Sequence, residues 1–369
     1  MTVILRWLLD LAARFTRTLD WPLCIALAAL MAIGLAVLYS AGNENSRLVL
    51  AQGSRYAIGF VAMWGLSRVP LNRLRAASPA LYAASLLPLL AVLAIGTGKH
   101  GQHWINLGLF YFQPAEVLKL SLPMMAAWHL NRESLPPRFL TVLASAAIIA
   151  LPTGLILLQP DFGTAMLVAS AGAFVLFLAG LSWWWFAAAV GGVAAAAPVA
   201  WFWMLRPYQK DRILTFLNPE SDPLGTGWNI IQSKIAIGSG GMTGQGWGQG
   251  TQSHLDYLPE HTTDFIFAVL SEEFGWIGVA VVLSLYLFIV GRCLWIASEA
   301  RDTYSRLIAG ALGMAFFVYV IVNGGMISGL LPVVGVPMPL LSYGGTAAVS
   351  LLAGLGVVMA VQAHRPARK

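Results

Sequence analysis

Residues 21–41 read Trp21-Pro-Leu-Cys-Ile-Ala-Leu-Ala-Ala-Leu-Met-Ala-Ile-Gly-Leu-Ala-Val-Leu-Tyr-Ser-Ala41, a stretch without a charged side chain. An α-helix needs about 20 such residues to cross the hydrocarbon core of a bilayer. Further apolar stretches of similar length follow along the chain. We therefore expect an all-α polytopic membrane protein with about ten transmembrane helices. The expected helices span residues 21–41, 51–68, 77–96, 114–131, 139–158, 163–181, 184–205, 264–291, 306–325 and 343–362.

The composition of the whole chain supports this fold class. Of its 369 residues, 58% are hydrophobic and 10% are charged, and the mean hydropathy is +0.73. A soluble globular domain carries about 25% charged residues, so a water-soluble fold is excluded. Cys24 and Cys293 lie in or near apolar stretches without the spacing of a metal site, and we expect both to be core residues without a disulfide.

Arginine and lysine residues gather on one side of this arrangement. An even number of crossings places both chain ends on the same side, and the loops of that side contain fourteen of the 22 Lys and Arg residues. Short cytoplasmic loops are enriched in these residues, so we expect both termini to be cytoplasmic. The net charge of +6 then reflects orientation, and no nucleic-acid partner is expected. The residues counted are Arg6, Arg14, Arg17, Arg68, Arg73, Arg75, Arg132, Arg138, Arg292, Arg301, Arg306, Arg365, Arg368 and Lys369.

The chain divides into three expected parts. Residues 1–20 form a basic amphipathic segment on the cytoplasmic surface, residues 21–362 the membrane domain, and residues 363–369 a cytoplasmic tail. Within the membrane domain, the polar segment 206–264 predicts one large extracytoplasmic loop. Its glycine run, residues 238–250, lacks the strand–turn–helix context of a nucleotide site. We expect a flexible loop there, whose backbone N–H groups contact a diphosphate or a sugar.

A carboxylate stands at the end of this loop, directly before an apolar span. The sequence there reads Leu258-Pro-Glu-His-Thr-Thr-Asp264-Phe-Ile-Phe267. A partly desolvated carboxylate at this boundary would have a raised pKa, which suits a general base. The structural alternative is a helix N-cap, a position where Asp is preferred, and the two roles are compatible. The eighth span, which follows, is too long for one straight crossing, and Glu272, Glu273 and Gly275 suggest that its first turns project from the bilayer.

Glu116 and Lys119 lie three residues apart on the fourth expected helix, so they point to one face. A charged side chain inside a bilayer costs at least about 2.5–3.5 kcal/mol when alone, and pairing offsets part of that cost. We expect an ion pair in the wall of a cavity, with a structural role as the alternative to a catalytic one.

Other polar residues on the expected outer face are candidates for substrate or cation binding. Asp161 sits in Gln159-Pro-Asp-Phe-Gly-Thr164, where its residue type alone fits a tight turn. Asp161 and Asp264 together could hold a divalent cation, Mg²⁺ or Mn²⁺, because hard cations prefer carboxylate oxygens. Arg206, Arg212 and Lys234 provide positive charge for an anionic substrate, with a solvated face as the alternative, and Glu260 and Ser342 are further candidates.

Two apolar stretches, residues 151–163 and 329–345, are interrupted by Pro and Gly. Broken backbone at membrane depth occurs where it is buried in protein or lines a wet cavity. Pairs of such stretches mark substrate sites in transporters, so they keep a transport function open.

The motifs taken together resemble one family, the SEDS glycosyltransferases (shape, elongation, division and sporulation). The resemblance extends over nearly the whole chain, and Val334 favours the elongation members over the division members. Three positions depart from the family pattern: His103 precedes Trp104 in place of an arginine, Ala115 replaces a serine, and His261 stands one place early. The matching stretches are Trp104–Gly108, Gln113–Glu116 with Lys119, Gln159–Thr164, Gly227–Gly241, Gly250–Gln252, Leu258–Glu260, Asp264–Ala268, Leu331–Pro337 and Ser342–Gly345.

The resemblance implies a ten-helix enzyme of the bacterial cytoplasmic (inner) membrane that polymerises lipid II into glycan strands at the outer face. It implies Asp264 as the essential aspartate, Glu116 and Lys119 as an ion pair, and Asp161 as an outer turn acid. It also implies a class B penicillin-binding protein and other elongation-complex membrane proteins as partners. No nucleotide is expected, since the lipid diphosphate supplies the driving force. The alternatives are a flippase or transporter of the same precursor, and a non-catalytic scaffold.

Overall fold

The computed structural model describes residues 17–97, 103–106, 108, 111–205, 207–221, 226–254, 258 and 260–364 of the chain. Most of the expected amphipathic N-terminus and C-terminal tail lies outside these residues. The expected all-α membrane fold is confirmed, and a helix occupies each of the ten expected ranges. These helices are α2 (Trp21–Ala41), α3 (Ser46–Ser67), α4 (Leu71–Ile95), α5 (Ala115–Leu130), α6 (Phe139–Leu158), α7 (Phe162–Leu178), α8 (Trp183–Val199), α12 (Ile266–Ser298), α13 (Thr303–Ile327) and α14 (Thr346–Ala363).

Local sequence explains where several helices begin and end. Asp20 caps α2 by accepting a hydrogen bond from Leu23 N, and Asn45 caps α3 by accepting one from Arg47 N. α3 therefore starts earlier than residue 51, the start predicted from hydropathy. α12 continues beyond residue 291, because Arg292 is accommodated inside the helix by an ion pair with Asp20.

Seven helices of the described residues are long and apolar enough to cross a membrane: α2, α4, α6, α8 with the π-helix that follows it, α12, α13 and α14. α7 is apolar but shorter. α5 spans 16 residues and carries the charged pair that the sequence predicts, while α3 carries Gln52 and Arg55 within its apolar stretch. α3 and α5 are thus less hydropathic than the other expected spans because they bring polar groups into the bundle.

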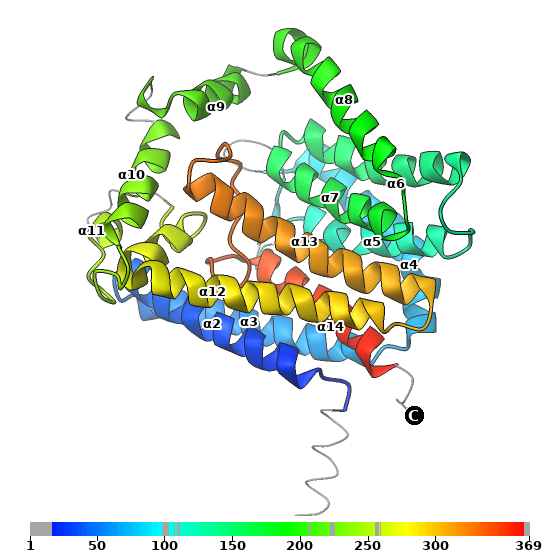
Figure 1. The fold of residues 1–369 in the computed structure, drawn as a ribbon, viewed down its shortest axis with the longest axis horizontal. Coiled ribbons are helices and arrows are strands. Elements are labelled where there is room, and N and C mark those ends of the chain that lie inside the picture. The colour runs from blue at the N-terminus through cyan, green and yellow to red at the C-terminus, as the bar shows by residue number, and fades with distance from the viewer. Residues whose placement is uncertain are drawn as a thin grey trace, which may run out of the picture.

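The bundle packs around α13 and α14, while α8 stands apart from it (Figure 1). α13 packs against α12, α7 and α5, and α14 packs against α3. In the most apolar window of each helix, 67% of α13 and 56% of α14 is buried, against none of α8. The start of α2 and the end of α14 lie at the same end of the bundle, as an even number of crossings requires (Figure 1).

The segment 206–264, predicted as one large extracytoplasmic loop, contains four helical segments among its described residues. The helical segments are α9 (Pro207–Leu217), the 3-10 helix η2 (Pro219–Ser221), α10 (Thr226–Ser239) and α11 (Thr251–His254), and α8 leads into them through the π-helix η1 (Ala200–Met204). α9 and α10 run back from the end of α8 toward the bundle, and the short α11 follows them (Figure 1). A two-residue hairpin, β1 (Ile105–Asn106) with β2 (Tyr111–Phe112), precedes α5 in the otherwise helical fold.

The glycine run after α10 forms a tight seam with α12, so the prediction of a flexible loop is wrong. α12 is interrupted at Gly275, where φ is +61° and ψ is −160°. The glycine-run backbone pairs with α12 on both sides of this break. A Cβ at Gly240 or Gly244 would collide with the backbone of Ser271 or Glu273, so only glycine permits the approach. The seam bonds are Gln245 N to Glu272 O (2.9 Å), Gly246 N to Glu273 O (3.0 Å), Trp276 N to Gly241 O (2.9 Å) and Ile277 N to Met242 O (3.1 Å).

Glu272 and Glu273 are buried beneath this seam, at 0% and 1% exposure, so these first turns of α12 are covered by protein. Glu272 Oε1 accepts hydrogen bonds from Thr251 Oγ1 and from Gln252 N, both at 3.1 Å. Glu273 accepts one from Ser40 Oγ at the end of α2. Both carboxylates fasten neighbouring segments to α12.

The two stretches predicted to be broken are both interrupted, but to different extents. Residues 151–158 continue α6 as helix through Pro152, and the interruption is confined to the turn before α7. Residues 329–345 are non-helical throughout. One interruption is therefore a three-residue turn between two helices, and the other is a long loop between α13 and α14.

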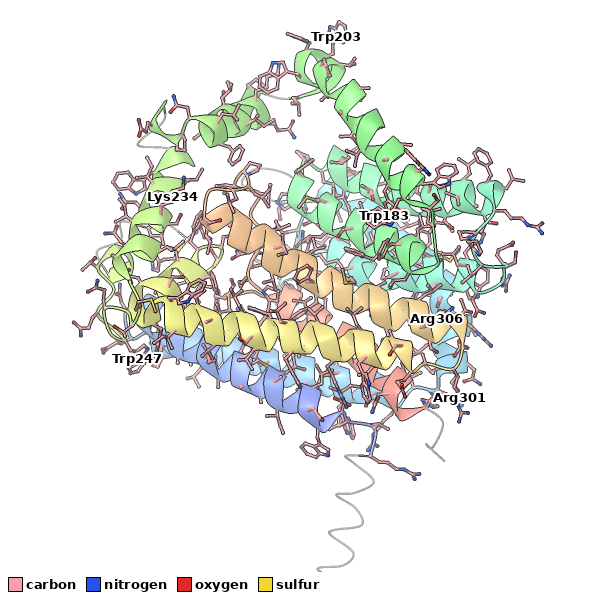
Figure 2. All side chains as sticks on the ribbon, in the orientation of Figure 1. Trp183, Trp203, Lys234, Trp247, Arg301 and Arg306 are labelled. Carbon is pink, nitrogen blue, oxygen red and sulfur yellow. The ribbon has the colours of Figure 1, made fainter. Side chains whose placement is uncertain are left out.

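The two ends of the bundle differ in their side chains (Figure 2). Arg301 and Arg306 lie at the end where α12 ends and α13 begins, and Lys234 and Trp247 lie at the opposite end. Trp247 stacks on Tyr39 with ring centroids 6.0 Å apart and fastens the glycine run to α2. The Arg-rich loop and the segment predicted to be external thus occupy opposite ends of the molecule.

Candidate active site

Asp264 lies in the turn of residues 260–265, at the end of the bundle that carries the glycine run. α12 begins at Ile266 with Phe265 in the N-cap position, so Asp264 stands one residue outside the cap and the predicted capping role is wrong. The turn is closed by Thr263 N and Phe265 N, which donate to Glu260 O at 3.1 and 3.2 Å. The side chain of Asp264 is half-buried.

The loop between α13 and α14, residues 328–345, holds this turn in place. Asn323, a buried residue of α13, donates through Nδ2 to Asp264 O at 2.8 Å and to Val336 O at 2.7 Å. Tyr343 N donates to Thr262 O at 2.9 Å. The turn that carries Asp264 is therefore anchored through its backbone by Asn323 and Tyr343.

Two glycines let this loop approach the neighbouring helices. Asp264 Oδ2 lies 3.6 Å from the position that a Cβ would take at Gly335, where φ is +72°. A Cβ at Gly163, in the first turn of α7, would come within 2.6 Å of Val334 O. The same short stretch of loop thus contacts Asp264 and the helix start that Asp161 caps.

Arg55 contacts the same loop and was not singled out by its sequence. Its guanidinium lies 4.3 Å from the ring centroid of Tyr343 and donates to Gln52 Oε1 at 3.3 Å. Gln52, which is fully buried, donates to Ser342 O at 3.2 Å and accepts from Gly344 N at 3.3 Å. The signal available was an arginine inside an apolar stretch, three residues from an amide.

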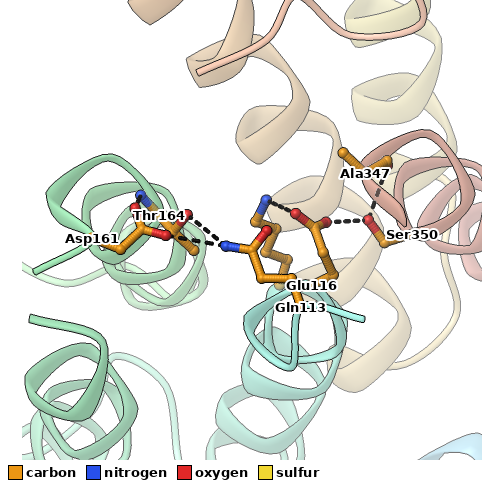
Figure 3. A network of polar contacts seen from close by, with 7 residues as sticks. Gln113, Glu116, Asp161, Thr164, Ala347 and Ser350 are labelled. Carbon is orange, nitrogen blue, oxygen red and sulfur yellow. Dashed lines mark hydrogen bonds and ion pairs between the residues drawn. The ribbon is translucent and has the colours of Figure 1, made fainter. Parts of the chain in front are cut away.

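Glu116 and Lys119 form the predicted ion pair, with Lys119 Nζ 2.6 Å from Glu116 Oε1. The second carboxylate oxygen, Oε2, accepts a hydrogen bond from Ser350 Oγ of α14 at 2.6 Å (Figure 3). The ammonium lies 5.1 Å from the ring centroid of Tyr319 on α13. Both side chains are mostly buried, and a cavity of about 30 Å³ adjoins Lys119, Tyr319 and Ser350. The pair joins three helices next to this small cavity.

Asp161 takes the structural role that its turn sequence indicated. It is the N-cap of α7, and its Oδ1 accepts from Thr164 N at 3.0 Å. Its Oδ2 accepts from Gln113 Nε2 at 3.1 Å, and Gln113 lies two residues before the start of α5 (Figure 3). Both carboxylate oxygens are engaged within the protein. Asp161 therefore ties α7 to the start of the helix that carries Glu116.

Two further predicted residues are engaged close to the Asp264 turn. Glu260 is exposed and accepts a hydrogen bond from Thr263 Oγ1 at 2.7 Å. Ser342 is buried, and its Oγ accepts from Met338 N at 2.8 Å. These contacts favour a structural role for Ser342 and leave Glu260 open to solvent.

The basic candidates of the segment 206–264 are only partly described. Lys234 Nζ lies 2.7 Å from the position of a Cβ at Gly329, just beyond the C-terminal end of α13. A cation there is favoured by the helix dipole, which explains its place without a substrate. Arg206 and the side chain of Arg212 lie outside the described residues.

Among the described residues, no group of three or more His, Cys, Asp or Glu side chains is arranged to hold a metal ion. The two oxygens of Asp161 already accept hydrogen bonds from Thr164 and Gln113. The pairing of Asp161 with Asp264 as metal ligands stays a prediction, and each Asp161 oxygen, which accepts one hydrogen bond, keeps a second lone pair.

Known proteins share both the sequence and this fold. Residues 17–367 match the model of the cell cycle protein family that groups FtsW, RodA and SpoVE. The chain belongs to this family. The chain is 46% identical over 348 residues to the peptidoglycan glycosyltransferase MrdB of Escherichia coli K12, covering 94% of each. It is 32% identical to the peptidoglycan glycosyltransferase RodA of Treponema pallidum, covering 94% of this chain and 98% of that protein.

Solved structures of the FtsW/RodA/SpoVE family agree with the arrangement described above. A chain of a peptidoglycan synthase complex that coordinates polymerization and crosslinking superposes with a TM-score of 0.83 at 32% identity, over 94% of this chain and 98% of that chain. The rod shape determining protein RodA of Thermus thermophilus superposes with a TM-score of 0.73 at 29% identity, over 95% and 98%. The predicted family and the multi-pass membrane fold are confirmed.

Proposed function

We propose that this protein is a peptidoglycan glycosyltransferase that polymerises lipid II into glycan strands during cell elongation. Relatives aligned over nearly their whole length carry that activity in their names. The structural observation that supports it is the position of Asp264. Its turn lies at the end of the bundle, ahead of α12, and is held through backbone bonds by Asn323 and Tyr343.

The chemistry requires a base and a way to stabilise a leaving group. The acceptor hydroxyl attacks the anomeric carbon of the donor sugar, a glycosidic bond forms, and the bond to the diphosphate breaks. Asp264 takes the hydroxyl proton, and the lipid diphosphate leaves with the bonding electron pair. A general base contributes about 10²–10⁴-fold to such a step, and fixed positive charge stabilises the departing anion.

The structure favours an enzyme over a carrier of the same precursor. A carrier places its indispensable charges near the bilayer midplane between paired broken helices. Here the two stretches predicted to be broken differ, because residues 151–163 are non-helical only at the turn before α7, whereas residues 329–345 are non-helical throughout. The Glu116–Lys119 pair is closed by Ser350, so its charges neutralise each other within the protein.

A divalent cation, Mg²⁺ or Mn²⁺, is proposed as a ligand that arrives with the substrate. Mg²⁺ is commonly held by one or two carboxylates together with substrate phosphates and waters. Asp264 would be the protein's contribution to such a site, and the cation would neutralise phosphate charge there. Removal of divalent cations by EDTA should then lower the polymerisation rate, and restoring Mg²⁺ or Mn²⁺ should recover it.

The proposed setting is the bacterial cytoplasmic membrane, with both termini inside and the Asp264 end outside. The Arg-rich end of the bundle, marked by Arg301 and Arg306 in Figure 2, supports this orientation. A class B penicillin-binding protein is the proposed partner, together with other membrane proteins of the elongation complex. The synthase complex that coordinates polymerization with crosslinking supports the first of these.

The deciding experiment compares wild type with Asp264→Asn, purified and reconstituted with lipid II and Mg²⁺. Strand formation is measured by gel, with and without the partner, and lipid II translocation is measured in sealed vesicles. Strands from wild type alone support the enzyme. Translocation by both proteins without polymer from either, even with the partner present, would establish the carrier instead.

A further inference from the structure

Arg55 carries a positive charge within α3 that no acidic side chain among the described residues neutralises. The ion pairs in the described part of the chain join Lys119 to Glu116 and Arg292 to Asp20. An ionised side chain inside a membrane helix is costly and is normally paired, or else it faces a cavity or a ligand. The position of Arg55 therefore calls for an anion that is not part of the described protein.

The surroundings of Arg55 hold it in place but use little of its bonding capacity. A guanidinium has five N–H donors, and the described residues accept one hydrogen bond from it, at Gln52 Oε1. The ring of Tyr343 lies against the guanidinium at 4.3 Å, an attractive cation–π contact that fixes the plane of the group. The side chain is half-buried, so part of it stays accessible.

A short path of contacts connects Arg55 to the catalytic turn. Tyr343, on which Arg55 stacks, donates through its backbone N–H to Thr262 O at 2.9 Å. Thr262 lies two residues before Asp264 in the turn 260–265. In the same loop, a Cβ added at Gly335 would lie 3.6 Å from Asp264 Oδ2. The positive group and the proposed base are thus both built onto one loop, at one end of the bundle.

We propose that Arg55 binds the diphosphate of the lipid-linked sugar substrate. The inference rests on the proposed function, which it deepens by naming a residue for the leaving group. A planar guanidinium donates two parallel N–H groups to phosphate oxygens. Its fixed charge stabilises the negative charge that develops as the bond to the diphosphate breaks. Binding by Arg55 involves no covalent step.

A purely structural role for Arg55 predicts different behaviour. If Arg55 served only to clamp Tyr343, then Tyr343→Leu would reproduce the effects of Arg55→Gln on both binding and stability. If Arg55 binds the diphosphate, Arg55→Gln weakens binding far more than Tyr343→Leu does, because only the former removes the charge. Arg55→Lys keeps the charge without the bidentate fork and should show an intermediate affinity.

The test measures binding of undecaprenyl diphosphate to the full-length protein in nanodiscs, with no sugar substrate present. Arg55→Gln should raise the Kd about tenfold to a hundredfold, the effect of losing a charge-assisted hydrogen bond. Arg47→Gln is the matched control, since Arg47 is exposed in the first turn of the same helix, and it should bind as wild type does. An unchanged Kd for Arg55→Gln overturns the inference.

Phosphatidylglycerol is the competing source of phosphate chemistry and forms a second arm. If Arg55 binds a phospholipid headgroup instead, Arg55→Gln will weaken retention of phosphatidylglycerol and leave the Kd of undecaprenyl diphosphate unchanged, which also overturns the inference. Polymerisation by wild type is scored separately. A wild type that polymerises while Arg55→Gln binds normally refutes only the role of Arg55, whereas a wild type that never polymerises refutes the proposed function.

Discussion

Two polar regions lie inside this bundle, and their charges are balanced in different ways. In the α5 network, defined as Gln113, Glu116, Lys119, Asp161, Thr164 and Ser350, every carboxylate oxygen accepts a hydrogen bond from within the protein. In the region of the Asp264 turn, residues 260–265, the backbone is anchored, and a guanidinium nearby has no acidic partner among the described residues.

The difference separates groups that hold the fold from groups that are available for chemistry. A closed network in a low-dielectric interior is stable only while every member is present. The turn that carries Asp264 is held by backbone hydrogen bonds from Asn323 and Tyr343, which do not depend on the protonation state of the carboxylate. The two regions meet at Val334 and Gly335, where one stretch of loop contacts both Gly163 of α7 and Asp264.

The largest contrast should appear when the same change is made in both regions. Asp264→Asn should lower polymerisation by about 10³-fold because the base is lost, with the free energy of unfolding changed by no more than about 0.5 kcal/mol. Asp161→Asn keeps an oxygen for the cap of α7 and should retain most of the activity. Rates of strand formation and unfolding curves in detergent measure both effects. Equal losses of activity in Asp264→Asn and Asp161→Asn would show that the two regions do not differ in function.

Breaking the buried ion pair should produce the largest loss of stability. Lys119→Met leaves Glu116 charged and unpaired, and should lower the free energy of unfolding by about 3–5 kcal/mol. The double variant Glu116→Gln with Lys119→Met removes both charges and should recover much of that loss. SDS-driven unfolding of the reconstituted protein provides the measurement. A double variant no more stable than Lys119→Met would mean that the pair is not closed as described.

The bond from α14 into the network should be worth somewhat less. Ser350→Ala removes the hydroxyl that donates to Glu116 Oε2, and the expected loss is about 1.5–3 kcal/mol because the acceptor is charged. Ser284→Ala is the matched control, since Ser284 is exposed and bonds only to Ala280 O of its own helix. The same unfolding assay compares them. Equal stabilities of the two variants would argue that Ser350 lies outside the network.

The smallest effect concerns the helix cap alone. Asp161→Ala removes the acceptor for Thr164 N and should cost about 0.5–2 kcal/mol. Asp161→Ser restores a capping oxygen but not the bond to Gln113, so the difference between the two variants isolates the cap. Thermal unfolding midpoints suffice for the comparison. If Asp161→Ser is no more stable than Asp161→Ala, then Asp161 stabilises the protein only through its hydrogen bond from Gln113.

Sequence patterns predict the α5 network better than the Asp264 region, for a physical reason. The Glu116–Lys119 pair follows from a three-residue spacing on one helix, and the turn role of Asp161 follows from its neighbours. These are local relations. The position of Arg55 depends on Tyr343, which lies almost 300 residues away in the chain, so no local pattern could reveal the contact.

Two other predictions failed because a tertiary contact replaced a local preference. Asp264 looked like an N-cap, but backbone bonds from Asn323 and Tyr343 fix the preceding turn and shift the helix start to Ile266. The glycine run looked flexible from its composition, yet backbone-to-backbone contact with α12 requires those glycines. The hydropathy of the spans, in contrast, placed all ten helices, with ends that differ from the structure by at most seven residues.

The seam between the glycine run and α12 determines where the segment 206–264 lies relative to α12. Its paired N–H and C=O groups lie on both sides of Gly275. The glycine run can therefore shift along α12 only by whole residues, because each backbone hydrogen bond must be exchanged for the next one. A shift of the register by one residue would carry Thr251 and Gln252 away from Glu272. A deletion or insertion of one residue in residues 240–250 should therefore displace the segment 206–264. Changes to outward-facing side chains in residues 240–250 should leave its position unchanged.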